Sequence, residues 1–472
     1  MISFDVQKVM KLVGLSFLVI FICNLLFTLI YMSSVMIPKD KVIESLRKSE
    51  ATGVLKTPLG SIERSTTGLG LDYGTECAAI SVGLKDKPMQ KNVNKLFSRF
   101  YDGYLVQGSN LQTFDPCSGL KELINPSNSS LKESGLISYA RNWWGMSIFI
   151  QLGILLFGLA SVKTYLFIAT IIFISIFYYK FSKLMSDWKP GIFLLAPLIL
   201  FGDFQEIHNS FPYSLFTIQL FTSSLILIKV LKSPKFEYLN LFLISIAMSS
   251  IYNFVFWLDF HIVITFVSAV IYLILVNKET IMEIYKKIFI FLSGYVVGFI
   301  TTTIIKWSLS IFFFGAEVRE TIGTALQVRL SAGTDGLNGP LLDYSSTFSS
   351  VPVPIRAVFL NAMVFASKIV DPRNASALGI VIIFLLFLFL SLKFVNTYKP
   401  TKIISKRNFL AFIPVFLIPY VYIMFTANHS FNHAVLIYRA IPVSVGFLLS
   451  LIHVMYAQNE MFLSTNVKKS ND

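Results

Sequence analysis

The chain has 472 residues, of which 54% are hydrophobic and only 14% are charged, and its mean hydropathy is +0.67. A soluble globular domain carries roughly 25% charged residues, so the composition excludes a protein that is solvated on all sides. The formal net charge of +14 does not indicate nucleic-acid binding, because Lys and Arg of membrane proteins accumulate in cytoplasmic loops and against anionic headgroups. We therefore expect an all-α polytopic membrane protein in contact with membrane lipids, with no nucleic-acid partner.

The first apolar run covers residues 12–37 and follows Lys8 and Lys11. A cleavable signal peptide has a shorter apolar core, of roughly 7–15 residues. Residues 1–37 are therefore predicted to form an uncleaved signal-anchor helix with its N-terminus in the cytoplasm. The polar region 38–142 follows, with turn clusters such as TPLG and INPSNSS. It is too long for a simple connector and is predicted to fold as an extracytoplasmic loop or cap.

Apolar runs that approach the ~20 residues of a membrane span recur after residue 142. We interpret them as spans at 143–160, 164–180, 212–231, 239–258, 261–277, 288–314, 377–395, 409–425 and 440–457. With the anchor they make about ten transmembrane helices, and they place both termini in the cytoplasm. The lysines and arginines of the short loops fall mostly inside on this assignment, as the charge bias of membrane proteins requires.

Two segments within this arrangement need a separate interpretation. The lysine-rich segment 180–189 falls outside on the assignment above, and the run 190–202 is too short to span comfortably. Two alternatives account for both segments. One is a re-entrant half-helix at 190–202 among the transmembrane helices of 143–315, and the other is an interfacial helix at 180–189. Residues 316–376, rich in Gly, Ser and Pro, are predicted to be a second extracytoplasmic loop or lid before the C-terminal helices and tail of 377–472.

Three cysteines are present. Cys23 lies inside the anchor helix and is expected to behave as a small apolar residue. Cys77 and Cys117 share the first outer loop, on the side of a bacterial inner membrane that is oxidising. They are a candidate disulfide, which would stabilise the loop by ~3–4 kcal/mol in the chain-entropy model.

Four clusters of ionisable residues lie at helix ends that the assignment places outside. They are Asp72 and Glu76 in LDYGTE; Asp203, Glu206 and His208 in GDFQEIHNS; Asp259 and His261 in FWLDFH; and His429, His433 and Arg439 in NHSFNHAVLIYR. We expect them to meet at one membrane face, and this convergence is the main functional signal of the sequence.

Such a face suits group transfer from a lipid-linked donor. A carboxylate at the bilayer surface can act as a general base toward an acceptor hydroxyl, and Arg matches the oxygens of a leaving phosphate. The catalytic candidates are Asp72, Glu76 and Asp203, and the candidates for binding substrate or phosphate are Arg141, Glu206, His208, His429, His433, Arg439 and Lys306.

Simpler interpretations compete with each assignment. The acids are also explained as solvated surface charges, and Arg439 and Lys306 as residues that reach to the interface. The spacing of His429 and His433 can bind a metal, but no third ligand follows nearby. The sequence thus establishes no cofactor or metal site and leaves a divalent cation open.

The order of one anchor, a large acidic outer loop and many spans resembles the GT-C class of integral-membrane glycosyltransferases. The segments LDYGTE, YARNWWGMSIF and NHSFNHAVLIYRAIP resemble bacterial cell-surface polysaccharide membrane proteins, with the O-antigen glucosyltransferases of serotype-converting phages as functional analogues. The class usually places its acidic motif close to the end of the first helix, where this chain has Asp40 and Glu44.

The resemblance implies an enzyme of the bacterial inner membrane with a periplasmic active site. It would transfer a hexose such as glucose from a polyprenyl-phosphate donor to a polysaccharide such as O-antigen, or to its lipid-linked oligosaccharide precursor, with inversion or retention. The alternatives are a transporter or flippase, a polysaccharide polymerase or ligase, and an acyltransferase. A transporter typically shows duplicated halves and ionisable residues at the bilayer midplane, and neither is visible in this sequence.

Overall fold

The structure is a computed structural model of the whole chain. It describes residues 6–34, 36–55, 62–63, 71–84, 104–106, 116–125, 136–138, 143, 145–201, 210–233, 236–255, 260–315, 318–320, 322–323, 326, 352–367, 412–426, 430 and 437–470. The predicted span at 377–395 lies outside these residues.

Helices dominate the described residues, as expected of an all-α membrane protein. Five of them are long and apolar enough to cross a membrane. They are α1 (Val6–Ser34), α7 (Leu159–Met185), α9 (Phe211–Leu231), α10 (Tyr238–Val255) and α12 (Ile281–Phe314). Shorter apolar helices are α6 (Gly145–Phe157), α8 (Lys189–Phe201), α11 (Phe260–Leu275), α15 (Val353–Ser367) and α18 (Ile413–Phe425), together with the first half of α21 (Ala440–Ser470).

The chain divides into two compact units. Unit 1 comprises residues 1–174, 205–258 and 289–325, and unit 2 comprises residues 175–204, 259–288 and 326–472. Helices α7 and α12 each begin in one unit and end in the other. Each unit is described by itself below.

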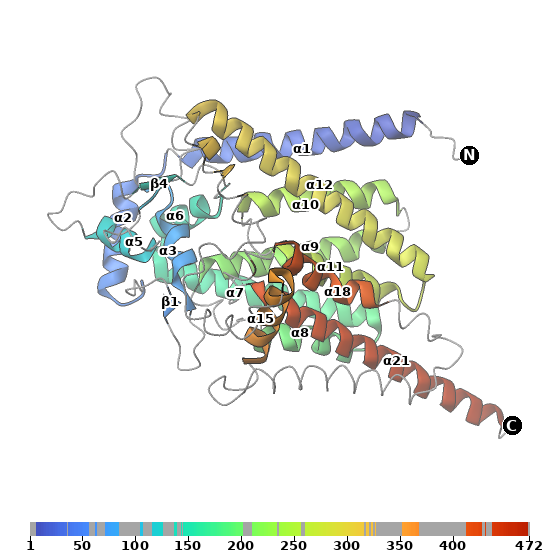
Figure 1. The fold of residues 1–472 in the computed structure, drawn as a ribbon. Coiled ribbons are helices and arrows are strands. Elements are labelled where there is room, and N and C mark those ends of the chain that lie inside the picture. The colour runs from blue at the N-terminus through green and yellow to red at the C-terminus, as the bar shows by residue number, and fades with distance from the viewer. Residues whose placement is uncertain are drawn as a thin grey trace. The chain divides into compact units, whose positions relative to one another are not determined.

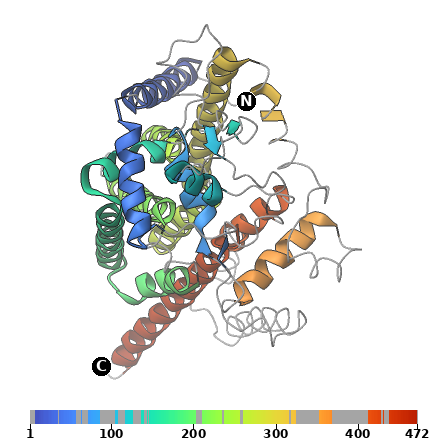
Figure 2. The same cartoon turned by 90° about the vertical axis from the view of Figure 1, so that its left-hand side faces the viewer.

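The polar region 38–142, here called the cap, belongs to unit 1. Its described elements are α2 (Lys39–Ala51), β1 (Ile62–Glu63), β2 (Leu71–Asp72), α3 (Tyr73–Ser81), β3 (Tyr104–Val106), α5 (Pro116–Ile124) and β4 (Leu136–Ser138). Strands β1 and β2 pair antiparallel with Ile62 opposite Asp72, and β3 pairs with β4 with Leu105 opposite Ile137. The helices of the cap lie together in two perpendicular views (Figures 1 and 2).

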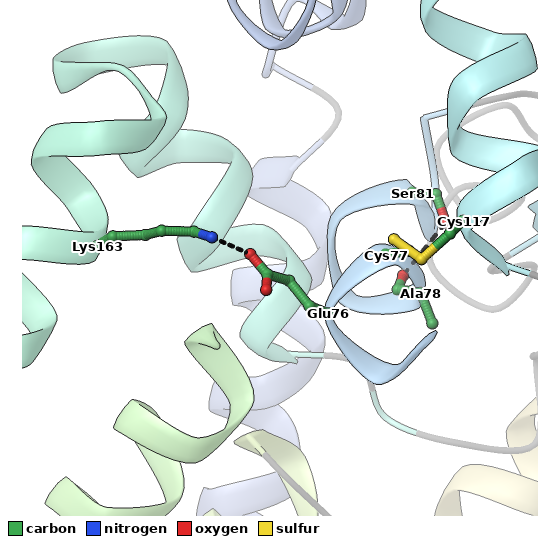
Figure 3. Close-up of a disulfide and its surroundings, with 6 residues drawn as sticks. All are labelled: Glu76, Cys77, Ala78, Ser81, Cys117 and Lys163. Atoms are coloured by element: carbon green, nitrogen blue, oxygen red, sulfur yellow. Dashed lines mark hydrogen bonds and ion pairs between the residues drawn. A yellow bond between two sulfur atoms is a disulfide. The ribbon is translucent and has the colours of Figure 1, made fainter. Parts of the chain in front are cut away.

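A disulfide joins α3 to α5 through Cys77 and Cys117, the pair that the sequence offered (Figure 3). Both cysteines are buried. Helix α2 is attached to α5 by Arg47, whose guanidinium donates two hydrogen bonds, of 3.0 and 2.9 Å, to the carbonyl oxygen of Ile124. Val42 and Leu46, four residues apart, form the buried face of α2. The cap is therefore folded around its own small core.

Helix α6 differs from the predicted span at 143–160. It has 13 residues, about 20 Å of helix, against a hydrocarbon core about 30 Å thick. It packs on the cap along its length: Gln151 donates to the carbonyl oxygens of Ile80 and Val82 at the end of α3, and Ser45 of α2 contacts the carbonyl oxygen of Ile154 at 3.5 Å. One face of α6 is thus buried against protein, whereas Phe149, Leu152, Leu156 and Phe157 leave an apolar face exposed.

The longer helices of unit 1 approach one another closely where the sequence supplies small residues. A Cβ atom at Gly298 of α12 would overlap with Ser249 and with the carbonyl oxygen of Ile246, both on α10. Asn253 of α10 donates to the carbonyl oxygen of Phe299 at 2.9 Å. Small residues and interhelical hydrogen bonds are the usual means by which helices associate in lipid.

In unit 2, α21 packs lengthwise on α8. Ser450 donates to the carbonyl oxygen of Pro190 at 2.8 Å, and a Cβ atom at Gly446 would overlap with the carbonyl oxygen of Leu194. Helix α8 has only 13 residues, a length that suits the half-helix considered at 190–202. Residues 180–185 continue α7, so the alternative of a separate helix at 180–189 is wrong. The helix α15 was not predicted, since residues 316–376 were interpreted as a loop.

The turn between α7 and α8 is held by Asp187. Its Oδ1 accepts a hydrogen bond of 3.0 Å from the backbone N–H of Lys189, and its Oδ2 lies 2.7 Å from Nε2 of His453 on α21. Partial burial raises the pKa of Asp187, but these two hydrogen bonds and the neighbouring positive charges lower it further, so the pKa lies below its ordinary value.

Candidate functional site

Asp72, the preferred catalytic candidate, is the last residue of β2 and directly precedes the first residue of α3, Tyr73. This is the N-cap position, where Asp, Asn and Ser are favoured because their oxygens accept hydrogen bonds from the first N–H groups of a helix. The position of Asp72 therefore has a structural explanation as well as a chemical one. The side chain of Asp72 lies outside the described part of the structure.

Glu76, in the first turn of α3, is buried in an ion pair. Its Oε1 lies 2.6 Å from Nζ of Lys163 on α7, and the side chains of Glu76 and Lys163 are 3% and 13% exposed (Figure 3). Nζ of Lys163 also lies 5.5 Å from the ring centroid of Phe211, the first residue of α9. An adjacent cation favours the ionised carboxylate, so Glu76 is better suited to attaching the cap to α7 and α9 than to accepting a proton.

Lys163 was not among the residues predicted from the sequence to form the site. The signal was present, since this lysine stands alone in the apolar run LASVKTYLFIAT. An ionisable residue inside an apolar segment generally has a specific partner or function. Together with the disulfide at Cys77 and the hydrogen bonds from Gln151 to the end of the helix, Lys163 holds α3 at three points.

Lys306 of α12 is 1% exposed and does not reach to solvent. Its Nζ lies 5.2 Å from the ring of Trp143 and 5.6 Å from the ring of Tyr31, near the end of α1 that leads into the cap. Trp143 in turn donates a hydrogen bond of 3.3 Å to the carbonyl oxygen of Thr302. These cation–π contacts stabilise a buried ammonium and connect α1, Trp143 and α12. The interpretation of Lys306 as a residue that snorkels to the interface is wrong.

A second group of buried polar residues lies in unit 2, where α11, α18 and the turn before α21 meet. Nε2 of His261 lies 3.0 Å from the carbonyl oxygen of Ile437, and the His261 ring stacks flat on Tyr422 of α18 with centroids 4.3 Å apart. Arg439 follows two residues after Ile437 and is 3% exposed. This group contains two of the predicted site residues, His261 and Arg439.

The other predicted residues are not placed. Seven of them lie outside the described residues: Asp203, Glu206, His208, Asp259, Arg141, His429 and His433. Asp72 belongs to unit 1 and Arg439 to unit 2, so the convergence of the four clusters stays a prediction. Within the described ranges, no group of three or more His, Cys, Asp or Glu side chains could hold a metal ion.

The acids nearest to the end of the first helix are on the surface. Glu44 pairs with Lys48 one turn later on α2 at 2.9 Å, and both side chains are exposed. The hydrogen bond from Lys48 lowers the pKa of Glu44. Asp40, in the first turn of α2, is also exposed. An exposed pair of this kind stabilises a protein little.

No known family model matches the sequence, and neither the curated proteins nor the solved structures include one that is significantly similar to it.

Proposed function

We propose that the protein is a membrane glycosyltransferase that moves a hexose from a polyprenyl-phosphate donor to a cell-surface polysaccharide or its lipid-linked precursor. The observation that carries the proposal is the acidic start of α3: a folded, disulfide-linked cap holds Glu76 beside the first turns of two apolar helices, α7 and α9, and Asp72 directly precedes the same short helix. A carboxylate placed where apolar helices begin suits chemistry on a headgroup whose lipid tail stays in the bilayer.

The charges at the helix ends support an extracytoplasmic location of the cap. Helices α7 and α9 both begin beside the cap, at Lys163 and Phe211, and both lead away from it into lysine-rich turns. Lysines of short loops concentrate on the cytoplasmic side, and disulfides persist on the oxidising side. The lysines that follow these two helices, or lie in their last turns, are Lys180, Lys183, Lys189, Lys229 and Lys232. On this orientation segment 180–189 is cytoplasmic, which removes the one exception to the charge bias. It also requires α8 to belong to a membrane crossing and not to a re-entrant segment.

In the proposed reaction the acceptor hydroxyl oxygen attacks the anomeric carbon of the hexose. The new C–O bond forms as the bond between that carbon and the phosphate oxygen breaks, and the electron pair leaves with the lipid phosphate. Asp72 takes the proton of the hydroxyl as general base. The sequence alone proposes Arg439 to hold the phosphate, because a guanidinium matches two phosphate oxygens.

The test uses Asp72→Asn. Asn caps a helix about as well as Asp but cannot accept the proton, so we expect transfer of labelled hexose from undecaprenyl phosphate to fall by roughly 10²–10⁴-fold with unchanged unfolding behaviour. Asp72→Ala, which removes both the base and the cap, should lower activity and stability together. Full transfer by Asp72→Asn would exclude Asp72 as the base.

A flippase or transporter is the principal alternative. It predicts that the wild-type protein in proteoliposomes moves a polyprenyl-phosphate sugar across the bilayer without cleaving the bond between phosphate and sugar. Recovery of intact donor in the opposite leaflet, with no sugar on any acceptor, would replace the enzyme proposal by this one.

A further inference from the structure

We infer that His261 is a positioning residue for Arg439, and that the two residues act as one unit in holding the phosphate of a polyprenyl-phosphate lipid. The inference deepens the proposed function, in which Arg439 alone was assigned to phosphate. It rests on the contacts among α11, α18 and the turn before α21, all within unit 2.

The first step is the hydrogen bond between His261 and the turn. A backbone carbonyl oxygen can only accept, so Nε2 of His261 carries a proton and donates it to the oxygen of Ile437 at 3.0 Å. Ile437 and His261 are 2% and 1% exposed. No water competes for this bond, and without the imidazole the Ile437 oxygen would be buried and unpaired.

The second step is the path from Ile437 to Arg439. Ile437, Tyr438 and Arg439 are consecutive, and the backbone N–H of Ile441 donates to the carbonyl oxygen of Tyr438 at 2.8 Å, which closes the turn into α21. A bond to the Ile437 oxygen therefore fixes the residue that leads into the turn of Tyr438 and Arg439. Arg439, which is 3% exposed, is held by a backbone whose place depends on His261.

The third step is the fixed orientation of the imidazole itself. Tyr422 covers its face with an interplanar angle of 0°, and Thr265, one turn later on α11, donates to the backbone oxygen of His261 at 2.7 Å. The ring is thus rigid, as required of a group that positions another. Nδ1 of His261 has no hydrogen-bond partner among the described residues, so Nε2 is the nitrogen through which the residue acts.

Two substitutions of His261 distinguish the role of Nε2 from that of Nδ1. The amide nitrogen of His261→Gln reaches the place of Nε2 and can still donate to Ile437, whereas the shorter amide of His261→Asn matches the place of Nδ1. We expect His261→Gln to bind undecaprenyl phosphate in nanodiscs within about 3-fold of wild type and His261→Asn to bind at least 10-fold more weakly, since a small misplacement of a binding group is costly. Arg439→Lys, which keeps the charge but loses the fork, should also weaken binding.

Coupling between the residues provides the decisive measurement. If His261 acts through Arg439, the double variant His261→Asn with Arg439→Lys binds no more weakly than the weaker single variant, because residues that act as a unit are not additive. Binding is measured on the monodisperse fraction of each variant, and thermal unfolding is recorded beside it. Inorganic phosphate as competitor distinguishes a site for the phosphate alone from one that also needs the lipid.

Several results would overturn the inference: additive losses in the double variant, normal binding by His261→Asn, lost binding by a well-folded His261→Gln, or no binding of undecaprenyl phosphate by the wild type. A different result would refute the proposed function alone. In that case the His261 and Arg439 variants bind undecaprenyl phosphate as expected, but neither wild type nor Asp72→Asn transfers any hexose.

Discussion

The buried pair of Glu76 and Lys163 offers a quantitative test of how the cap is attached. Removing one partner of a buried ion pair typically costs about 3–5 kcal/mol, because the remaining charge is left without compensation. Lys163 is 13% exposed and Glu76 only 3%, so an orphaned lysine can reach water more readily than an orphaned carboxylate. We therefore expect Lys163→Met to destabilise the protein more than Glu76→Gln.

We expect at least about 3 kcal/mol for Lys163→Met, because the carboxylate that it leaves unpaired is only 3% exposed; this is a change of at least roughly 150-fold in the folding equilibrium. The double variant should lie within about 1 kcal/mol of wild type, since a buried pair replaced by uncharged groups is often neutral. The assay is equilibrium unfolding in detergent micelles followed by tryptophan fluorescence. Glu44→Gln, at an exposed pair on the same cap, is the control and should have no measurable effect.

The reasoning depends on the non-additivity of the two changes. A coupling of at least about 2 kcal/mol between Glu76→Gln and Lys163→Met is expected for residues in direct contact. If the double variant instead shows the sum of the two losses, the two charges do not stabilise each other, and the attachment of the cap must be sought in its apolar contacts.

Three further predictions follow from the fold. Replacing Cys77 and Cys117, which are 40 positions apart in sequence, by Ser should cost about 4 kcal/mol in the loop-closure model, measured by the same unfolding assay with wild type in reductant as the comparison. A single cysteine that replaces Ala160, in the first turn of α7, should react with a membrane-impermeant maleimide on intact spheroplasts. A single cysteine that replaces Trp188 should react only after permeabilisation. The reverse pattern would show that α6 spans the membrane. The pKa of Asp187 is lowered in the folded protein. The contribution of Asp187 to stability is therefore fully present above its unfolded pKa of about 3.9 and is lost as the pH falls through the folded pKa. Unfolding curves from pH 7 to pH 3 should show this loss of stability in wild type and less of it in Asp187→Asn.

The sequence was informative where hydrophobicity alone decides the structure. The runs predicted at 212–231, 239–258 and 261–277 correspond to α9, α10 and α11 within a few residues, because a long apolar run in a chain of this composition has few alternatives to a helix. The cysteine pair was predictable for a similar reason, since only two cysteines lie in the cap.

Hydrophobicity along the sequence could not predict whether an apolar surface contacts lipid or another part of the protein. Helix α6 has the hydrophobicity of a span, yet one of its faces packs on α2 and α3, and no local pattern distinguishes a protein partner from lipid. Helix α2 was missed although Val42 and Leu46 have helical spacing, because its many charges suggested a solvated loop. The pairing of Glu76 with Lys163 joins residues 87 positions apart by their numbering, and only the tertiary fold brings them together.

The position of Lys163 has a consequence for biogenesis. On the proposed orientation the cap is exported ahead of α7, since residues 38–142 precede that helix in the chain. During this interval the Glu76 carboxylate has no lysine beside it, and the newly translocated domain is incomplete. Arrival of the next membrane segment supplies the missing cation, so maturation of the exported domain is coupled to the insertion of a helix encoded downstream of it.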